Sequence, residues 1–358
     1  MRGVMNGRLL RFTALAIASV GVLALACTTD DDGGDGTLSV VLDREELKCG
    51  VNEGVPGFGF LQPDGSYSGF DVQFCRAVAA AVLGDADDVE FVPLTAAARF
   101  ESLSSSEIDV LIRNTTWTSS RDSDLGASFT VTTFYDGQGM MVRADSGFRA
   151  LEDMVGATIC VLQGTTTELN LDDRFTGAGI PYTPLTFEDN ETLQAAFVEE
   201  RCDGWTSDKS QLASRRSAFP ADAGGPDSLV VLAETFSKEP LGPLTRDGDS
   251  EWFDIVNWVV IGMITADEFG ITSENVDQVA ANPPNKNVAR LLGVAFEGGD
   301  PFDPKLGIDV DFMQQVLKQV GNYDEVYQAN ITPLGLPREG TLNASWLDGG
   351  LIYAPPVR

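Results

Sequence analysis

The sequence contains no histidine in its 358 residues. Nucleophilic catalysis by Ser-His-Asp or Cys-His, zinc sites that use histidine, and the usual proton shuttle near neutral pH are therefore excluded. Basic residues are also scarce, because 24 Lys and Arg stand against 54 Asp and Glu, for a formal net charge of −30. Such a charge repels nucleic acid. We expect no nucleic-acid partner, no cofactor and no metal ion, and we favour a role other than catalysis.

Long apolar runs are lacking except at the start of the chain. Phe12–Leu25 is apolar, follows Arg2, Arg8 and Arg11, and is too short for a comfortable membrane span. Small residues precede Cys27, as in a secretory signal that ends at a lipidated cysteine. The alternative is an uncleaved anchor helix.

The segment after Cys27 is rich in Asp and Gly, which is typical of a flexible tether. We predict a signal peptide over residues 1–26, and a lipidated cysteine with its tether over residues 27–37. The protein is then exported and held at the periplasmic or outer cell surface through Cys27.

Cysteine is rare, and the four that follow Cys27 form an even set in an exported chain, which favours two disulfides over buried free thiols. Three pairings are possible. Pairing Cys49 with Cys75 and Cys160 with Cys202 keeps each bond within one local unit, where each would stabilise its unit by about 3–4 kcal/mol.

Short apolar runs alternate with helical patterns along the rest of the chain, which predicts parallel sheets with helices on both faces. One such series contains strands at 48–52, 89–94 and 109–112 and helices at 72–83 and 97–104. Asp71 is expected to cap the first of these helices. A second contains strands at 157–162, 182–187 and 202–206 with helices at 165–175 and 191–200.

Two α/β lobes follow from this repetition, because about 320 residues exceed a single core. Two extended stretches, 134–142 and 230–243, cross between the lobes as a two-segment hinge. We predict one lobe from residues 38–138 and 236–358, including helices at 251–269, 287–294 and 310–320 that cover it. The other lobe comprises residues 139–235.

Polar clusters follow three of the predicted strands, at the edge where open α/β sheets bind ligands. Residues 113–121 begin with Arg113, Asn114 and Thr116 and end with Arg121, which can clamp a carboxylate with two hydrogen bonds. Hydroxyl clusters of this kind also serve simply as helix caps.

The second lobe contributes two further clusters. In residues 162–168, Thr165 and Glu168 fit a capping box, and Thr166 is free to face the cleft that we expect between the two lobes. Asp208 ends the third cluster, at 206–208, and is either a helix cap or a partner for an ammonium group. With Arg121 across the cleft, it would bind the two charged ends of an α-amino acid.

Eight segments resemble the general L-amino-acid-binding proteins of polar amino-acid ABC transporters (solute-binding protein family 3), and they keep their order from Leu38 to Arg358. They are Cys49–Asn52, Gly69–Val72, Cys75–Ala79, Arg113–Thr118, Phe134–Gly139, Gln163–Glu168, Lys238–Pro243 and Asp348–Pro356. The resemblance implies a type II periplasmic-binding-protein fold with two doubly wound α/β lobes, acting as a monomer that delivers an L-amino acid to permease subunits.

The resemblance also assigns the site. It gives Arg121 the α-carboxylate, Asp208 the ammonium group, and further polar contacts to Asn114, Thr116 and Thr166. Relatives selective for acidic side chains have an arginine at the position of Arg99, with Arg113 nearby. A surface ion pair of Arg99 with Glu101 or Asp109 is the alternative. Asn52 replaces an aspartate of binders of basic amino acids and so argues against lysine or arginine as ligand.

Two other functions stay open on the same fold. One is a periplasmic lyase resembling the cyclohexadienyl dehydratases, and the other is a ligand-sensing pair of lobes. An amino acid recovered unchanged from the native protein would favour the carrier over the lyase.

Overall fold

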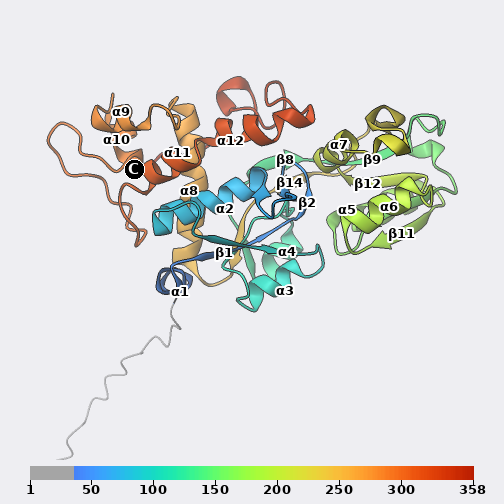
Figure 1. The fold of residues 1–358 in the computed structure, drawn as a ribbon, viewed down its shortest axis with the longest axis horizontal. Helices are drawn as coiled ribbons and strands as arrows, with labels where there is room; N and C mark the ends of the chain where they lie inside the picture. The colour runs from blue at the N-terminus through green and yellow to red at the C-terminus, as the bar shows by residue number, and fades with distance from the viewer. Residues whose placement is uncertain (1–35) are drawn as a thin grey trace, which may run out of the picture. The chain divides into compact units, whose positions relative to one another are not determined.

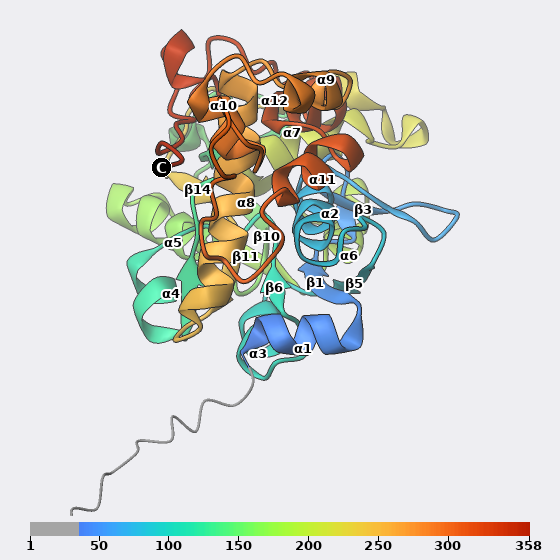
Figure 2. The same cartoon turned by 90° about the vertical axis from the view of Figure 1, so that its left-hand side faces the viewer.

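The computed structural model describes residues 36–358. This part of the chain contains two five-stranded sheets, each with helices on both faces (Figures 1 and 2). The two α/β lobes predicted from the sequence are thereby confirmed. Cys27 and the predicted signal and tether up to residue 35 lie outside the described residues. None of the helices within residues 36–358 combines the length and the apolar character that a membrane crossing requires.

The sheet of the first lobe has the strand order β5-β1-β6-β15-β7, from β1 (Leu47–Val51), β5 (Val89–Pro93), β6 (Val110–Leu111), β7 (Ala127–Phe129) and β15 (Leu244–Arg246). Strand β1 pairs in parallel with β5 and β6, whereas β15 is antiparallel to β6 and β7. Adjacent side chains of a strand point to opposite faces. Val110 accordingly packs in the large core with α2 (Phe70–Leu83) and α8 (Ser250–Glu268), and Leu111 in a smaller one with α3 (Arg99–Ser104).

The sheet of the second lobe has the order β11-β10-β12-β9-β13, from β9 (Gln138–Arg143), β10 (Thr158–Leu162), β11 (Thr183–Phe187), β12 (Gly204–Asp208) and β13 (Leu229–Val231). Consecutive residues again divide between two cores. Val161 packs with α5 (Thr166–Ala178), while Leu162 packs with α6 (Asn190–Val198) and α7 (Lys209–Ser217).

Two strands connect the sheets. β8 (Phe134–Asp136) and β14 (Glu239–Leu241) form an antiparallel pair in which Asp136 faces Glu239 and Phe134 faces Leu241. Both strands lie within the stretches predicted to cross between the lobes, so the two crossings are hydrogen-bonded to each other.

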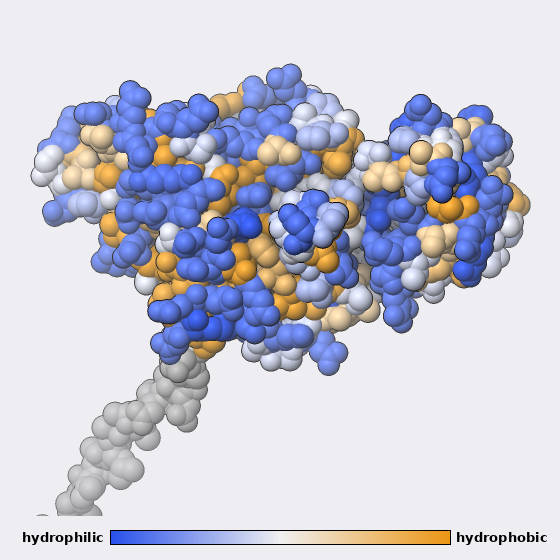
Figure 3. Space-filling view, in the orientation of Figure 1, coloured by the Kyte–Doolittle hydropathy of each residue, from blue (hydrophilic) through white to orange (hydrophobic). Residues whose placement is uncertain are grey.

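The remaining α-helices and the small sheet belong to the first lobe. The N-terminal half contributes α1 (Thr37–Arg44), the small sheet β2 (Gly54–Val55), β3 (Gly59–Leu61) and β4 (Tyr67–Ser68), and α4 (Ser119–Asp124). The C-terminal segment adds α9 (Val276–Ala281), α10 (Lys286–Leu291), α11 (Phe312–Gln319) and α12 (Tyr323–Asn330). Buried residues of these helices join the large core beside α2 and α8, as expected for helices that cover the first lobe. On the face in Figure 3, hydrophilic residues cover most of the surface and apolar residues occur as scattered spots.

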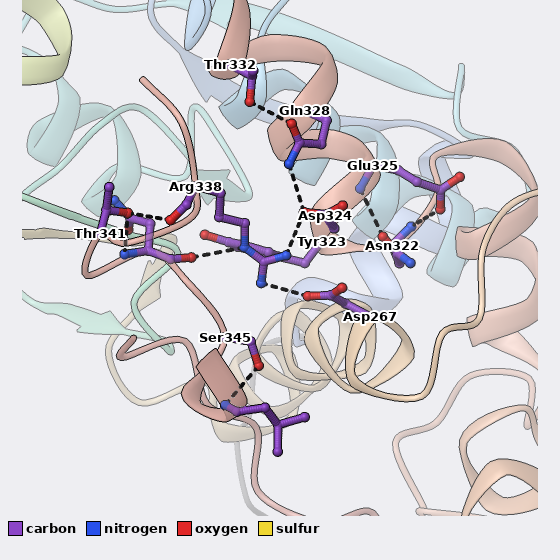
Figure 4. A network of polar contacts seen from close by, with 12 residues as sticks. Asp267, Asn322, Tyr323, Asp324, Glu325, Gln328, Thr332, Arg338, Thr341 and Ser345 are labelled. Carbon is purple, nitrogen blue, oxygen red and sulfur yellow. Dashed lines mark hydrogen bonds and ion pairs between the residues drawn. The ribbon is translucent and has the colours of Figure 1, made fainter. Parts of the chain in front are cut away.

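A buried arginine fastens the C-terminal segment to this lobe (Figure 4). Arg338 forms ion pairs of 2.7 Å with Asp267 of α8 and with Asp324 of α12. Its guanidinium also lies 4.7 Å from the ring centre of Tyr323. Two carboxylates and an aromatic face around one buried cation hold the segment after α12 against the two helices.

The four cysteines of the described chain form two disulfides, Cys49–Cys75 and Cys160–Cys202. The first joins β1 to α2, and the second joins β10 to the segment before β12. Each lobe contains one of the two bonds, so neither restrains movement between the lobes.

One local expectation is wrong. Asp71 does not cap α2, which begins at Phe70 after Gly69. The Asp71 carboxylate instead accepts a 2.6 Å hydrogen bond from the backbone N–H of Asn114. Asp71 therefore binds a backbone group 43 residues away in the sequence instead of the end of its own helix, and it supplies the acceptor that the partly buried N–H of Asn114 requires.

Candidate functional site

The carboxyl ends of strands from both lobes meet around one small cavity of about 20 Å³. Six of the seven residues proposed from the sequence line it: Arg99, Arg113, Asn114, Thr116, Thr166 and Asp208. Asn52, Ala96, Leu162, Thr165, Thr167, Ser207 and Gln211 complete the lining. The volume accommodates about one water molecule. A molecule of the size of an amino acid enters only if the lobes or side chains around the cavity move.

The first-lobe part of the site is held by contacts behind the cavity. Asn114 follows β6 with a φ of 27°, and Asp71 accepts its backbone N–H. The side-chain oxygen of Asn114 accepts a 3.1 Å hydrogen bond from the side-chain amide of Asn52. The Nε of Arg113 donates to the carbonyl of Leu94 over 2.7 Å. The loop is thus fixed by β1, α2 and β5 together.

Burial perturbs the charges behind this loop. It raises the pKa of Asp71 to about 7, although the N–H of Asn114 and the charge of Arg113 oppose the rise. Burial likewise lowers the pKa of Arg113 to about 10. Burial makes the charged form of each group less stable, and the attraction between the two opposite charges offsets part of that loss.

The second-lobe loop has the capping arrangement expected of it, with one difference. The Thr165 hydroxyl accepts the N–H of Glu168 over 3.1 Å and so caps α5. The Glu168 carboxylate accepts the N–H of Gly164 rather than that of Thr165. Thr166 lies at the first position of the helix, and its Oγ is 3.3 Å from the Oγ of Thr116 in the other lobe. The lobes are in direct contact at the cavity.

Asp208 ends β12 and precedes α7, yet its side chain forms no capping hydrogen bond. The residue is 5% exposed, and its Oδ1 has no hydrogen-bond partner. Burial raises the pKa of Asp208 well above its ordinary value, and the nearby carboxylates of Asp136 and Glu239 raise it further. A buried carboxylate oxygen without a donor favours binding of a cationic group.

Arg99 is the complementary case. It is 3% exposed and its Nε has no hydrogen-bond partner, although its guanidinium lies 5.1 Å from the ring centre of Phe100. Burial lowers the pKa of Arg99 well below its ordinary value, and the charges of Arg121 and Arg113 lower it further. Among the described residues it forms no ion pair with Glu101 or Asp109, and Asp109 pairs with Arg44 instead. An anion would relieve this crowding of like charges.

Arg121 is not among the residues that line the cavity. Its Nη1 donates to the backbone carbonyl of Thr116 over 3.0 Å, and its guanidinium lies 5.3 Å from the ring centre of Phe100. Burial lowers its pKa, whereas the charges of Glu239 and Asp208 raise it. Arg121 is thus next to the cavity residue Thr116, and its guanidinium lies near the same Phe100 ring as that of Arg99.

Two polar residues at or beside the cavity lie outside the three clusters predicted from the sequence and were missed. Gln211 lines the cavity from α7, a helix that the sequence pattern did not predict, and lies 3.5 Å from the side-chain nitrogen of Asn114. Glu239 accepts a 2.7 Å hydrogen bond from the hydroxyl of Thr166. A glutamate within an apolar crossing strand was the available signal for the second. No group of three potential metal ligands was found among residues 36–358.

Several known proteins are similar to this chain over most of its length. The glutamate/glutamine/aspartate/asparagine-binding protein BztA of Rhodobacter capsulatus is 46% identical over 344 residues, covering 95% of this chain and 99% of that protein. The general L-amino acid-binding periplasmic protein AapJ of Rhizobium johnstonii is 45% identical over 346 residues, covering 96% of both. A periplasmic binding protein from Brucella ovis with glutathione bound superposes with a TM-score of 0.84 at 44% identity, covering 91% of this chain and all of that one.

The family is defined by a match over most of both lobes. Residues 47–274, from β1 to just beyond α8, match the family model of bacterial extracellular solute-binding proteins, family 3. The matched range includes every residue of the cavity, and both sheets with their crossing strands have the type II periplasmic-binding fold. The chain belongs to the bacterial extracellular solute-binding proteins of family 3.

Proposed function

We propose that this protein is exported, binds an L-α-amino acid between its two lobes, and delivers it to the permease of an ABC transporter. The observation that carries the proposal is the pair formed by Asp208 and Arg99. Each is buried, each has a polar atom without a hydrogen-bond partner, and the two have opposite charges around one cavity. A ligand with both a cationic and an anionic group satisfies both.

Arg121 and Asp208 bind the α-carboxylate and the α-ammonium group, from opposite lobes. Arg121 lies next to the cavity, because its Nη1 donates a hydrogen bond to the backbone carbonyl of the cavity residue Thr116. Asn114, Thr116 and Thr166 supply neutral hydrogen bonds around the two charges. A site that binds both charged ends of the α-amino acid group can accept several side chains.

The side-chain end of the site favours acidic and amide amino acids. Two arginines, Arg99 and Arg113, line the cavity against the single carboxylate of Asp208. A ligand with one net negative charge balances this lining, and a neutral amide can accept hydrogen bonds from the same guanidinium groups. The name of the Rhodobacter relative, which gives glutamate, glutamine, aspartate and asparagine, supports this class.

Binding involves movement of the lobes about the crossing strands β8 and β14. Residues 38–138 and 236–358 form one moving body, and residues 139–235 the other. A cavity of about 20 Å³ is far smaller than an amino acid, so the lobes separate to admit it. The ligand then stabilises the conformation in which both lobes contact it. Cys27 holds the exported protein at the membrane as a lipid anchor.

The protein releases its ligand unchanged and is not an enzyme. The relatives named above are binding proteins by name, which favours the carrier over a lyase on the same fold. The test is mass analysis of the amino acid that copurifies with the native protein, followed by incubation with an excess of that amino acid. We expect one of the four acidic or amide amino acids, unchanged after incubation. Its conversion to a product would overturn the carrier function.

A further inference from the structure

A chain of three hydrogen-bonding side chains runs from the first lobe to one of the crossing strands. The Oγ atoms of Thr116 and Thr166 are 3.3 Å apart, and the hydroxyl of Thr166 donates to Oε2 of Glu239 over 2.7 Å. Glu239 is 1% exposed and lies on β14. Thr116 also forms a backbone bridge with Leu241 of the same strand. Strand β14 therefore contacts both ends of this series of hydrogen-bonded side chains.

The direction of these hydrogen bonds follows from the number of hydrogens. A carboxylate only accepts, and a hydroxyl has one hydrogen to donate. Because the hydrogen of Thr166 is used on Glu239, the contact between the two threonines requires Thr116 to donate. The hydroxyl of Thr166 therefore has no hydrogen left for the cavity, and its remaining lone pair is suited to accept a hydrogen bond from an ammonium group.

The other oxygen of Glu239 is fixed independently. Oε1 accepts from Nδ2 of Asn170 over 2.8 Å and from the hydroxyl of Ser237. Three donors therefore hold the carboxylate in place, and only one of them, Thr166, lines the cavity. Glu239 itself is not among the lining residues, so any effect it has on a ligand acts through Thr166.

We infer that Glu239 is a positioning residue, which orients the hydroxyl of Thr166 as an acceptor for the α-ammonium group of the ligand. The inference rests on the proposed function, since it assigns a role within the same site. It also gives the orientation of the ligand in the site. Asp208 and Thr166 of the second lobe together accept hydrogen bonds from the ammonium group, and the donors of the first lobe face the carboxylate.

Glu239→Gln is the informative substitution. Glutamine keeps the volume but has one acceptor oxygen and one donor group. Two donors, from Asn170 and Ser237, hold the oxygen on their side, so the amide N–H groups face Thr166. Thr166 must then accept from the glutamine amide, and its own hydrogen turns towards the cavity, where it repels an ammonium group. A purely structural role would be preserved by this isosteric change.

The experiment is a double-mutant cycle measured by calorimetric titration with L-glutamate. We expect E239Q and E239A to weaken binding about tenfold in the wild-type background, and by less than about twofold in the T166V background. The conservative T166S keeps the hydroxyl, so E239Q should retain its full effect there. N170A, which removes a partner of Glu239 outside the cavity, should leave the affinity nearly unchanged.

The outcomes separate the inference from the proposed function. If E239Q and E239A cost the same factor with and without the Thr166 hydroxyl, or cost nothing, Glu239 does not act through Thr166 and the inference is wrong. If the folded wild-type protein binds no amino acid at all, both the inference and the proposed function fail. Thermal unfolding of each variant identifies one that has lost its fold, and E239Q, which keeps the packing, then replaces E239A in the cycle.

Discussion

The guanidinium of Arg215, in α7 of the second lobe, donates a hydrogen bond to the backbone carbonyl of Gly54 in the first lobe. The neighbouring hydroxyl of Ser214 donates to the carbonyl of Pro56 over 2.7 Å. Arg215 is 6% exposed and also pairs with Glu191 over 3.2 Å. None of these residues lines the cavity at the strand ends. The lobes are therefore held together by contacts that no ligand provides.

Replacing Arg215 by alanine should weaken the binding of every amino acid by a similar factor, roughly tenfold. The reason is that Arg215 stabilises the conformation in which the lobes touch, and does not contact the ligand. Calorimetric titration with glutamate, glutamine, aspartate and alanine measures the factor, and small-angle scattering without ligand should show a larger radius of gyration. R216A is the control, because Arg216 donates to the carbonyl of Pro226 within its own lobe. A loss confined to one amino acid would place Arg215 in the specificity site instead.

Arg121→Ala and Asp208→Ala should each cost about 2–5 kcal/mol of binding free energy with all ligands, because each leaves a buried charge of the ligand unpaired. That is about 30-fold or more in affinity. Calorimetry with the same four amino acids measures the loss. Asp208→Asn, which keeps the shape and removes the charge, should resemble Asp208→Ala. Normal binding by folded R121A and D208A would show that the α-amino acid group is bound elsewhere.

Arg99→Ala should change selectivity rather than overall affinity. Glutamate and aspartate should lose more affinity than glutamine and alanine, because Arg99 is assigned to the side chain of the ligand. The ratio of dissociation constants for glutamate and glutamine is the readout, with a shift of about tenfold expected for the loss of one charged hydrogen bond. Arg76→Ala is the control, since Arg76 pairs with Asp87 on the surface of the first lobe. An equal loss for all four ligands would move Arg99 to the shared part of the site.

Asp71 should make the stability of the protein depend on pH. Burial raises its pKa from the ordinary 3.8 to about 7, so the folded state binds a proton that the unfolded state has released between these values. This contribution is complete below about pH 4 and is lost as the pH rises through about 7. In the variant Asp71→Asn, the amide oxygen would still accept the N–H of Asn114, and the side chain would not titrate.

The measurement is urea unfolding of the wild type and of D71N at several pH values across this range. The stability of the wild type relative to D71N should fall by at least about 1 kcal/mol as the pH rises. D124N, at an exposed position of α4, should follow the wild type. Parallel curves for the wild type and D71N would mean that Asp71 does not titrate in this range.

Cys27→Ser should release the protein from membranes into the soluble fraction without changing its ligand affinity. The lipid would be attached at Cys27, and the acidic tether that follows separates it from the first described residues. Fractionation of cells that express the variant, with calorimetry on the purified protein, tests both parts. A C27S protein that stays in the membrane fraction would argue against the lipid anchor.

Local patterns in the sequence were sufficient for most of the architecture. Apolar runs at the spacing of buried strands, separated by helical periods, predicted the central series of alternating strands and helices in each lobe, and β5 and β10 differ from the expected ranges by one residue. These patterns predict helices and strands because each element buries one face, and the residues of that face recur at a fixed spacing in the local sequence. The helix α7 was missed, because its sequence, Lys209–Ser217, is polar and its buried residues include Ser210, Gln211 and Arg215.

The sequence by itself determined the strand-end positions of the site residues, the two lobes, and a charge set suited to an amino acid. Only the tertiary structure decided how those charges are satisfied. Asp71 accepts from Asn114 rather than capping its helix, Asp208 keeps an oxygen without a donor, and Glu239 takes the hydrogen of Thr166. The partners of a buried polar group come from elements far apart in the chain, and their number of donors and acceptors is fixed only when those elements pack together.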